Sequence, residues 1–505
     1  MRQRPLIACL IGCALVSACA PAPEEPVASA ARAAPAAAPV PVSGVSPFTA
    51  GCAPDPDQRF GERVEDAEME SFLAVNPRNP ANLVVVWMQD LFNGIVGAAT
   101  RDGGRSWTVV PIAGSSVCTG GEFDLAADPT VSFGPDGTAY LAGFSLDLPD
   151  AQLPVPTRTR LFATTSTNGG FDWAPLVEVT GGYGTLHDMP AIAADPERAC
   201  TAYLVWTDEF TAFGPASVGL MFARTDDCGR SWSAPITVFA PTATTAPFSV
   251  TMGSRMLVLR DGTLLIATTA MSSLLAHAYP EAADPQPSSL VVFRSADGGA
   301  TWSSAQHVAQ FANGPFQDPE TGEKVLHSPF FVSASVAPDG ATYVAWRQQL
   351  TASTADIRMV RSTNHGATWS EPIVVRASGT QMMTPTLATG RDGSIAVTYY
   401  DTRNDALADH ALWADYWVAQ SADGGASWTE SHVAGPFDLG AAAKMVVPAE
   451  GLMVGEYAGL VPVPGGFAAS FAMSGAPATA GASDIFFASI RGHAAQADDW
   501  DAPSY

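Results

Sequence analysis

The stretch TRDGGRSW at residues 100–107 decides the fold, because five variants of it follow along the chain. They read STNGGFDW, TDDCGRSW, SADGGATW, STNHGATW and SADGGASW, and they start at residues 166, 225, 295, 362 and 421. In every copy an acidic or amide residue follows a Ser or Thr by two positions, and a Trp closes the phrase. These residues are Asp102, Asn168, Asp227, Asp297, Asn364 and Asp423. Self-similarity at such regular spacing indicates a repeat architecture in which each copy marks one supersecondary unit.

Each copy stands next to short apolar runs that are typical of β-strands. Residues 219–224 (GLMFAR) precede one copy, and residues 108–112 (TVVPI) follow another. Asp and Asn side chains hydrogen-bond backbone groups two residues on, and Gly adopts the positive φ that a tight turn needs. The Trp offers a large apolar face for packing between neighbouring sheets. We therefore expect all six copies to be hairpin turns that stabilise the fold and take no part in catalysis.

The repeated phrase is the Asp-box, and the chain resembles the bacterial neuraminidase repeat (BNR) and sialidase-like propellers. The resemblance implies an all-β fold, a β-propeller. A second recurrent turn, at residues 135–137, 260–262, 338–340, 391–393 and 464–466 and more loosely at 76–82 and 195–200, gives seven first hairpins. The last unit, residues 456–490, has no box and no clear fourth strand, which the segment before Glu70 could supply. Seven blades over residues 52–492 are favoured, with six, the usual number in sialidases, as the alternative.

The N-terminus reads as an export signal. In residues 1–19, Arg2 and Arg4 precede an apolar run that is too short to span a membrane. The end of this run, VSAC at residues 16–19, resembles the lipobox of bacterial lipoproteins, in which cleavage leaves an acylated Cys19. The resemblance implies an outer-membrane lipoprotein of the cell envelope. Residues 20–51, rich in Ala and Pro, are expected to form a disordered tether, and residues 493–505 a C-terminal tail.

The charge balance limits the partners. The chain carries 50 acidic and 25 basic residues, which gives a net charge of −25. This charge disfavours binding to nucleic acid or to anionic membrane surfaces. We therefore expect contact with a membrane through the lipid anchor only, a glycan or glycoconjugate as ligand, and a monomer.

Four cysteines lie downstream of the signal, and export permits disulfides. They allow three sets of pairings. We favour Cys200–Cys228, inside one repeat unit, together with Cys52–Cys118, which would clamp the N-terminal segment to the first unit. A C-x-x-C spacing is absent from the sequence, so we expect no zinc site.

The alternation of strands predicts where function lies. If the strands of each unit run up and down, the first hairpin turns and the boxes share one rim. The longest connections join second to third strands at the other rim: residues 145–159, 207–218, 270–289, 348–356 and 401–415. Loop variation on a rigid scaffold is where binding and catalysis concentrate. We therefore expect the functional face opposite the boxes.

Aligning the first strands places one position from each unit near the mouth of the central channel. These positions are Glu70, Asp128, Asp188, Gly253, Phe331, Thr384 and Tyr457, with Glu456 beside the last. Crowded carboxylates have separated pKa values and can act as acid and base, or they can coordinate Ca²⁺. They can also simply accept backbone N–H bonds. We expect no cofactor to be required, with Ca²⁺ as a possible one.

A polar and aromatic segment in the sixth unit is a second candidate. Its side chains are Tyr400, Asp401, Arg403, Trp413 and Tyr416. Aromatic faces beside Asp and Arg suit sugar rings. The competing interpretation is a packing cluster between units, with Asp401 and Arg403 paired locally. Three loop histidines, His187, His327 and His410, also fall near the same rim, but their spacing requires no metal.

The resemblance to sialidases assigns roles to these residues. A sialidase uses three Arg that hold the substrate carboxylate, a Tyr nucleophile activated by Glu, and an Asp acid/base. Arg347 and Arg403 are matched to the grip, with Arg158 or Arg160 as the third. Tyr457 with Glu456, or Tyr400 with Asp401, is matched to the nucleophile, and Asp188 or Asp128 to the acid. The Arg-Ile-Pro motif of sialidases has no counterpart in this sequence.

The expected function is thus an envelope-anchored exo-glycosidase of sialidase type that acts on terminal sugars. Two alternatives remain open: a non-catalytic propeller that binds glycan or protein at the same rim, and an assembly factor of the envelope.

Overall fold

Antiparallel β-sheets dominate the computed structural model. It describes residues 38–48, 52, 61–62, 64–148, 158–210, 218–241, 250–272, 286–314, 316–327, 330–377, 379–406, 409–446, 450–475 and 481–492. The predicted signal with Cys19, most of the predicted tether and the predicted tail fall outside these residues, as do parts of the long connections. In the described part of the chain, no helix is long and apolar enough to cross a membrane.

Within the described residues, seven four-stranded sheets follow one another. Their strands are, sheet by sheet: β3 (Met69–Val75), β4 (Leu83–Gln89), β5 (Gly94–Thr100) and β6 (Thr108–Pro111); β7 (Leu125–Phe133), β8 (Ala139–Leu146), β9 (Thr159–Ser166) and β10 (Val177–Gly182); β11 (Thr185–Ala194), β12 (Ala202–Phe210), β13 (Val218–Thr225) and β14 (Ile236–Phe239); β15 (Val250–Val258), β16 (Leu264–Met271), β17 (Gln286–Ser295) and β18 (Gln306–Asn313); β21 (Ser333–Val336), β22 (Thr342–Thr351), β23 (Thr354–Ser362) and β24 (Ile373–Ala377); β25 (Met382–Thr389), β26 (Ile395–Asp401), β27 (Trp413–Ser421) and β28 (Thr429–Asp438); and β31 (Gly459–Val463), β32 (Gly466–Ser474), β33 (Ser483–Arg491) and β1 (Val40–Pro41).

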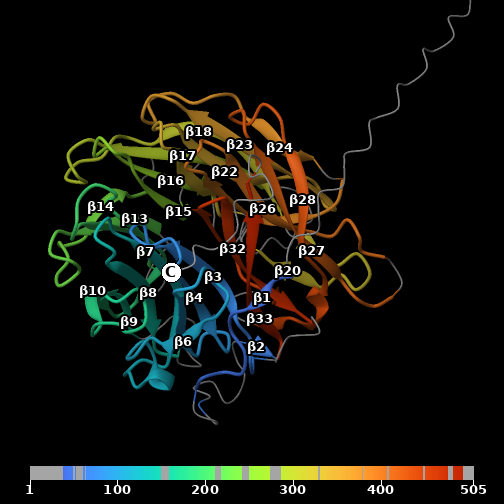
Figure 1. Ribbon diagram of the computed structural model, residues 1–505, viewed down its shortest axis with the longest axis horizontal. Coiled ribbons are helices and arrows are strands. Elements are labelled where there is room, and N and C mark those ends of the chain that lie inside the picture. The colour runs from blue at the N-terminus through green and yellow to red at the C-terminus, as the bar shows by residue number, and fades with distance from the viewer. Residues whose placement is uncertain are drawn as a thin grey trace, which may run out of the picture. The chain divides into compact units, whose positions relative to one another are not determined.

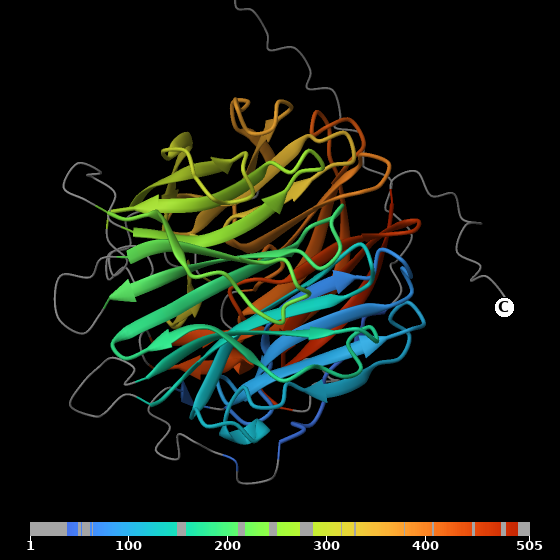
Figure 2. The ribbon, with the colours of Figure 1, turned by 90° about the vertical axis from the view of Figure 1, so that its left-hand side faces the viewer.

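The first strands of these sheets contact one another in a closed cycle. The order is β3, β7, β11, β15, β21, β25, β31 and back to β3. In Figure 1 the sheets of residues 36–505 follow one another around a common centre, and Figure 2 shows their strands running between two edges where loops gather. The all-β propeller expected from the boxes is confirmed.

The last sheet obtains its outer strand from the beginning of the chain. Val40 of β1 pairs with Phe487 of β33, and Pro41 pairs with Phe486. The segment before Glu70 thus supplies the missing strand, as expected. Because this strand lies within residues 20–51, part of the range assigned to the tether belongs to the β structure. The unpaired edge of β33 explains the difference, since an uncovered edge offers a row of free backbone groups.

The Asp-boxes are turns whose side chains satisfy their own backbone. In the first box, Asp102 Oδ1 accepts hydrogen bonds from the Arg105 and Ser106 amides at 2.9 and 3.0 Å, and Thr100 Oγ1 donates to it at 2.7 Å. Trp107 packs edge-on against Phe487 of the last sheet, with ring centroids 5.3 Å apart. The box is therefore a turn and an inter-sheet contact together.

Two boxes replace a glycine of the phrase by a residue that makes a cross-link. Cys228 and His365 stand at this position with φ of 63° and 57°, in the left-handed region that favours glycine. Cys228 forms a disulfide with Cys200, and Nδ1 of His365 lies 2.7 Å from Oδ2 of Asp261 in the preceding sheet. The second disulfide joins Cys52 to Cys118. Both disulfides are the pairings favoured from the sequence.

A five-stranded accessory sheet, which the sequence analysis did not predict, crosses between units. It contains β19 (Phe316–Gln317), β20 (Lys324–Leu326), β30 (Gly451–Met453), β29 (Ala443–Met445) and β2 (Gly61–Glu62). Val325 of β20 pairs in parallel with Leu452 of β30, and both side chains are buried in one apolar core. Connections that join the fourth strand of one sheet to the first strand of the next thus carry structure too. The long connections are not confined to those between second and third strands.

Candidate functional site

Bulges in the first strands turn single side chains out of the regular alternation. The pairing register shifts at Glu70, Asp128, Met189, Gly253 and Thr384, where φ is 58°, 52°, 52°, 67° and 54°. Positive φ is uncommon for residues other than glycine, and β-bulges are frequent where a side chain has to be re-aimed next to a functional site. The sequence alignment selected four of these five positions. In the third sheet the bulge residue is Met189, one position after Asp188.

Five acidic residues, which we call the acid cluster, gather beside these bulges; three are buried, and Asp188 and Glu456 are half-buried. The cluster contains Glu70, Asp128, Asp188, Glu209 and Glu456. Hydrogen bonds join Glu70 to Asp128, Asp128 to Asp188 and Asp188 to Glu209. Burial, followed by the charges of neighbouring carboxylates, raises the pKa of every member well above its ordinary value. Three residues proposed from the sequence, Asp128, Asp188 and Glu456, are thus brought together.

Tyr457 has Glu70 as its partner. The Tyr457 side chain is hydrogen-bonded to Glu70, and its hydroxyl oxygen lies 3.4 Å from the carbonyl oxygen of Pro129. The sequence analysis paired Tyr457 with Glu456, its neighbour in the chain. Burial, together with the charges of Glu70 and Asp128, raises the pKa of Tyr457, while the nearby Arg255 lowers it. The structure therefore contains a Tyr–Glu pair, but the glutamate is Glu70 of the first sheet and not Glu456.

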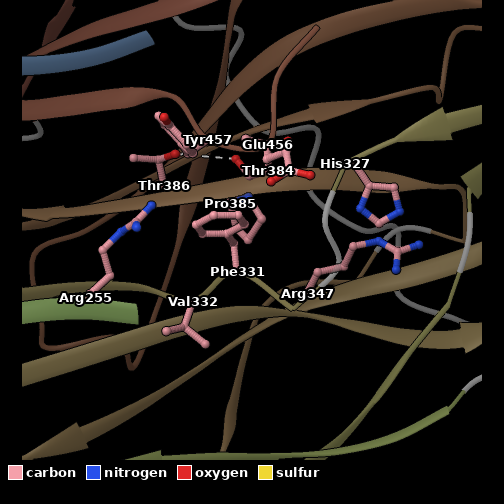
Figure 3. Close-up of a pocket in the computed structure, with 10 residues that line it drawn as sticks. All are labelled: Arg255, His327, Phe331, Val332, Arg347, Thr384, Pro385, Thr386, Glu456 and Tyr457. Atoms are coloured by element: carbon pink, nitrogen blue, oxygen red, sulfur yellow. Dashed lines mark hydrogen bonds between the residues drawn. The ribbon is translucent and has the colours of Figure 1, made fainter. Parts of the chain in front are cut away.

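A pocket lies against this group, and Figure 3 shows its side chains. It holds about 310 Å³ of space between atoms, part of it open solvent. Arg255 borders one side, and Arg347 with His327 borders the other; Phe331 and Pro385 lie between them (Figure 3). The remaining lining residues are Val332, Thr384, Thr386, Glu456 and Tyr457. The channel mouth therefore presents two guanidinium groups, a carboxyl group and a phenol to one space.

The two arginines are cations of different exposure: Arg347 is buried and Arg255 is half-buried. Arg347 donates to the carbonyl oxygen of Met382 at 2.6 Å and to Oε1 of Gln381 at 2.6 Å, and Arg255 donates to the carbonyl oxygen of Ser254 at 3.1 Å. Among the described residues, neither guanidinium group forms an ion pair with a carboxylate. Burial lowers the pKa of Arg255 to about 10 and that of Arg347 to about 9, so both are charged at neutral pH. Arg255 had no role in the sequence analysis, because nothing local distinguishes it from other arginines on strands.

The segment of the sixth unit lies apart from the pocket. Arg403 forms ion pairs with Asp401 and Glu430, both at 2.6 Å, and its guanidinium carbon lies 4.0 Å from the ring centre of Trp417. The other three side chains also have local partners: the Tyr400 hydroxyl donates to the carbonyl oxygen of Ala472, Tyr416 donates to Thr398 Oγ1, and Trp413 Nε1 donates to Asp409. None of the five lines the pocket. The contacts of Tyr400, Asp401, Arg403, Trp413 and Tyr416 are of the kind that the competing interpretation, a packing cluster, expects, and the substrate-binding roles of these residues stay a prediction.

The remaining candidates also have local partners. Arg158 pairs with Asp147 at 3.0 Å, and Arg160 donates to the carbonyl oxygen of Gly114 at 2.9 Å. Neither arginine lines the pocket, and the third member of the grip stays a prediction. Nδ1 of His187 lies 2.6 Å from Asp208 Oδ1. Over the described ranges, no two histidines share a group with metal-ligand spacing.

Comparisons with known proteins agree with this architecture. Residues 205–455 match the family model of the BNR repeat-like domain. No curated protein matches the chain. A solved protein of unknown function from Dyadobacter fermentans is similar to it, with 13% identity over 90% of this chain and 99% of that chain and a TM-score of 0.48. The α-L-arabinanase of Penicillium chrysogenum is also similar, with 13% identity over 90% of this chain and 98% of that chain and a TM-score of 0.44. The sialidase of Trypanosoma rangeli has 11% identity over 70% of this chain and 54% of that chain, with a TM-score of 0.42.

The matched residues contain four of the six Asp-boxes. The other two boxes connect strands in sheets of the same four-stranded build. The chain is a sialidase-like β-propeller protein with BNR repeats and Asp-boxes.

Proposed function

We propose that the protein is an exo-glycosidase that binds the terminal acidic sugar of a glycan in the pocket between Arg255 and Arg347. One observation carries the proposal: two guanidinium groups without a carboxylate partner in the described chain, a buried one on Arg347 and a half-buried one on Arg255, share this pocket with Glu456 and Tyr457. Buried charges are normally paired, so a site of this kind lacks an anion. A planar guanidinium group suits a carboxylate in particular. Phe331 offers an apolar face to the sugar ring.

The proposed chemistry uses the Tyr–Glu pair and Glu456. The oxygen of Tyr457 attacks the anomeric carbon, and the phenolic proton passes to the carboxylate of Glu70. The glycosidic bond breaks, and Glu456 donates its proton to the departing oxygen. Water then attacks the anomeric carbon and gives a proton to Glu456, while the tyrosine oxygen leaves and regains its proton from Glu70. Because burial raises the pKa of Glu456, its carboxyl group holds a proton to higher pH than an ordinary glutamic acid, which suits it to the acid role.

Binding without turnover is the second candidate, and one observation favours it. The pKa of Tyr457 is raised, which makes the phenol a weak nucleophile unless Glu70 accepts its proton. If Glu70 is itself protonated, as its own raised pKa favours, the site binds an acidic sugar and leaves the bond intact. We also propose, from the signal sequence alone, that Cys19 carries the lipid that anchors the protein in the outer membrane.

The test is a panel of fluorogenic glycosides given to protein without residues 1–19. The panel contains the N-acetylneuraminic acid, glucuronic acid, arabinofuranose and galactose derivatives. We expect turnover of an acidic member, loss of binding in Arg255→Met and Arg347→Met, and loss of turnover with retained binding in Tyr457→Phe. Saturable binding of an acidic sugar without turnover would select the second candidate. Equal behaviour of acidic and neutral sugars would contradict the assigned role of the arginines.

A further inference from the structure

The imidazole of His327 is a buried polar group in the pocket without an assigned role. His327 directly follows β20 of the accessory sheet and is 3% exposed. Within the described residues, neither ring nitrogen has a well-directed hydrogen bond to another group. Figure 3 shows the ring beside the guanidinium group of Arg347 at the edge of the pocket. Leaving a buried polar group without a partner costs about 1–3 kcal/mol, so this ring destabilises the folded state unless a ligand pairs with it.

The surroundings of His327 keep it neutral. Burial, followed by the positive charge of Arg347, lowers its pKa well below the ordinary value, and the backbone at Gly314 offsets only part of this. A neutral imidazole has one N–H donor and one acceptor nitrogen. Arg255 and Arg347 can only donate. The Thr386 hydroxyl already donates within the protein, to the carbonyl oxygens of Thr384 and Ala458 at 3.5 and 3.4 Å, so its proton is engaged there.

We propose that His327 recognises a hydroxyl group of the acidic sugar and thereby sets which sugar the pocket accepts. This inference rests on the proposed function. A hydroxyl group donates one hydrogen bond and accepts others, which matches the two ring nitrogens of a neutral imidazole. Arg347 beside the ring holds the carboxylate, so the recognised hydroxyl lies close to that carboxylate on the sugar. A site whose buried polar group hydrogen-bonds a hydroxyl group of the sugar binds an analogue without that hydroxyl group much more weakly.

The position of His327 in the fold supports a specificity role. It belongs to the connection between the fourth and fifth sheets, outside the repeated phrase and next to the accessory sheet. The same connection supplies Gly314, whose carbonyl oxygen accepts from Arg347 at 3.3 Å, and Phe331. Segments outside a repeat vary without loss of the scaffold. The accessory sheet is therefore the element that fixes the specificity side of the pocket.

The experiment measures binding of N-acetylneuraminic acid, glucuronic acid and their monodeoxy derivatives by calorimetry. For the acid that binds, we expect one monodeoxy derivative to bind the unchanged protein about 10- to 100-fold more weakly than the parent. In His327→Leu we expect the ratio of the two dissociation constants, derivative over parent, to fall to about one. The hydroxyl group of the parent acid loses its hydrogen-bond partner, whereas the derivative has no hydroxyl group at that position. His327→Asn retains a hydrogen-bond donor and an acceptor, so we expect a ratio between that of the unchanged protein and one. His410→Leu, the same change at an exposed histidine, is the matched control.

A second measurement does not depend on the folding of a variant. On the unchanged protein, the ring ¹⁵N resonances of His327 should shift when the parent acid binds and remain in place with the monodeoxy derivative. A folded His327→Leu protein with an unchanged ratio, or a ring that does not respond to the parent acid, overturns the inference and leaves the proposed function intact. Absence of binding by both parent acids overturns the proposed function and the inference with it.

Discussion

The box carboxylates and the acid cluster are the same chemical groups in opposite environments. Asp102, Asp227 and Asp297 lie at the turn surface, and their pKa values are lowered to about 2. Burial is the largest single influence on the pKa of Asp102 and raises it, but the hydrogen bonds from neighbouring hydroxyl and amide groups together outweigh it; in Asp227 and Asp297 these hydrogen bonds come first. Glu70 and Asp128 are buried, Asp188 is half-buried, and hydrogen bonds join Asp128 to each of the other two; the pKa values of all three are raised. The repeated carboxylates are fully satisfied by their own turn. The carboxylates of the acid cluster, which are not part of the repeat, need a proton or a ligand to offset their charge. This difference in environment distinguishes residues that stabilise the fold from residues of the candidate site.

Replacing Glu456 tests the comparison most strongly. Glu456→Gln removes the proposed proton donor but keeps the volume of the side chain, so we expect turnover to fall by at least about 100-fold. The melting temperature should stay the same or rise, because one buried ionisable group is gone. The measurement is kcat on the acidic glycoside together with a thermal melt.

The matched control for Glu456→Gln is Asp297→Asn, the same chemical change in a box. Two natural boxes already carry Asn, at Asn168 and Asn364, and there Oδ1 accepts the turn amides as the carboxylate does elsewhere. We expect unchanged turnover in this variant. An equal loss in both variants would mean that the two regions do not differ in function.

The pH dependence of stability should reveal the acid cluster. Its carboxyl groups have a folded pKa above the unfolded value near 4, so the folded state binds more protons once the pH exceeds about 4. Stability is therefore greatest near pH 4 and declines as the pH rises toward the folded pKa values. We expect the melting temperature at pH 8 to lie on the order of 5 °C below that at pH 5. Asp128→Asn should reduce this difference, and a pH-independent melting temperature would contradict the assigned environment.

A box carboxylate should show the opposite pH dependence with a smaller effect. Asp102→Ala removes four hydrogen bonds of the turn, and we expect the melting temperature at pH 7 to fall by about 2–4 °C with turnover unchanged. The folded pKa of Asp102 lies below the unfolded value, so its contribution is present above pH 4 and lost as the pH falls toward 2. The difference between variant and parent should therefore disappear in acid, as thermal melts at pH 7 and pH 2.5 would show.

A small effect on activity is expected at Arg403. Because its charge is paired with Asp401 and Glu430 outside the pocket, Arg403→Gln should leave kcat/KM within about twofold. The melting temperature should fall, since a carboxylate loses its partner. Kinetics on the acidic glycoside check this, and a loss of binding would return Arg403 to the substrate grip.

What the sequence could predict depends on the range of the interactions. Each box is a local phrase whose side chains bond within four residues, so the repeat and the propeller could be read from it. The acid cluster was found in part, since alignment of the first strands located Glu70, Asp128 and Asp188. Glu209 was missed because it stands on a second strand and meets the cluster only through Asp188.

The accessory sheet and the pocket arginines could not be predicted. Strands of two or three residues have no measurable periodicity, and β2, β20 and β30 come from distant segments whose pairing no local pattern records. Arg255 and Arg403 illustrate the same limit. Only the packed structure shows that Arg255 faces the pocket while Arg403 is neutralised by Asp401 and Glu430.

Strand β1 makes the order of synthesis matter. Residues 40–41 are synthesised before all seven sheets and have to wait for residues 483–491 before they can pair with the edge of β33. Contacts of such long sequence separation form late, because closing a long loop is entropically unfavourable. Until then the unfinished protein exposes a strand edge that can pair with another chain. A chain shortened at its C-terminus should therefore aggregate during production rather than accumulate as a smaller folded disc.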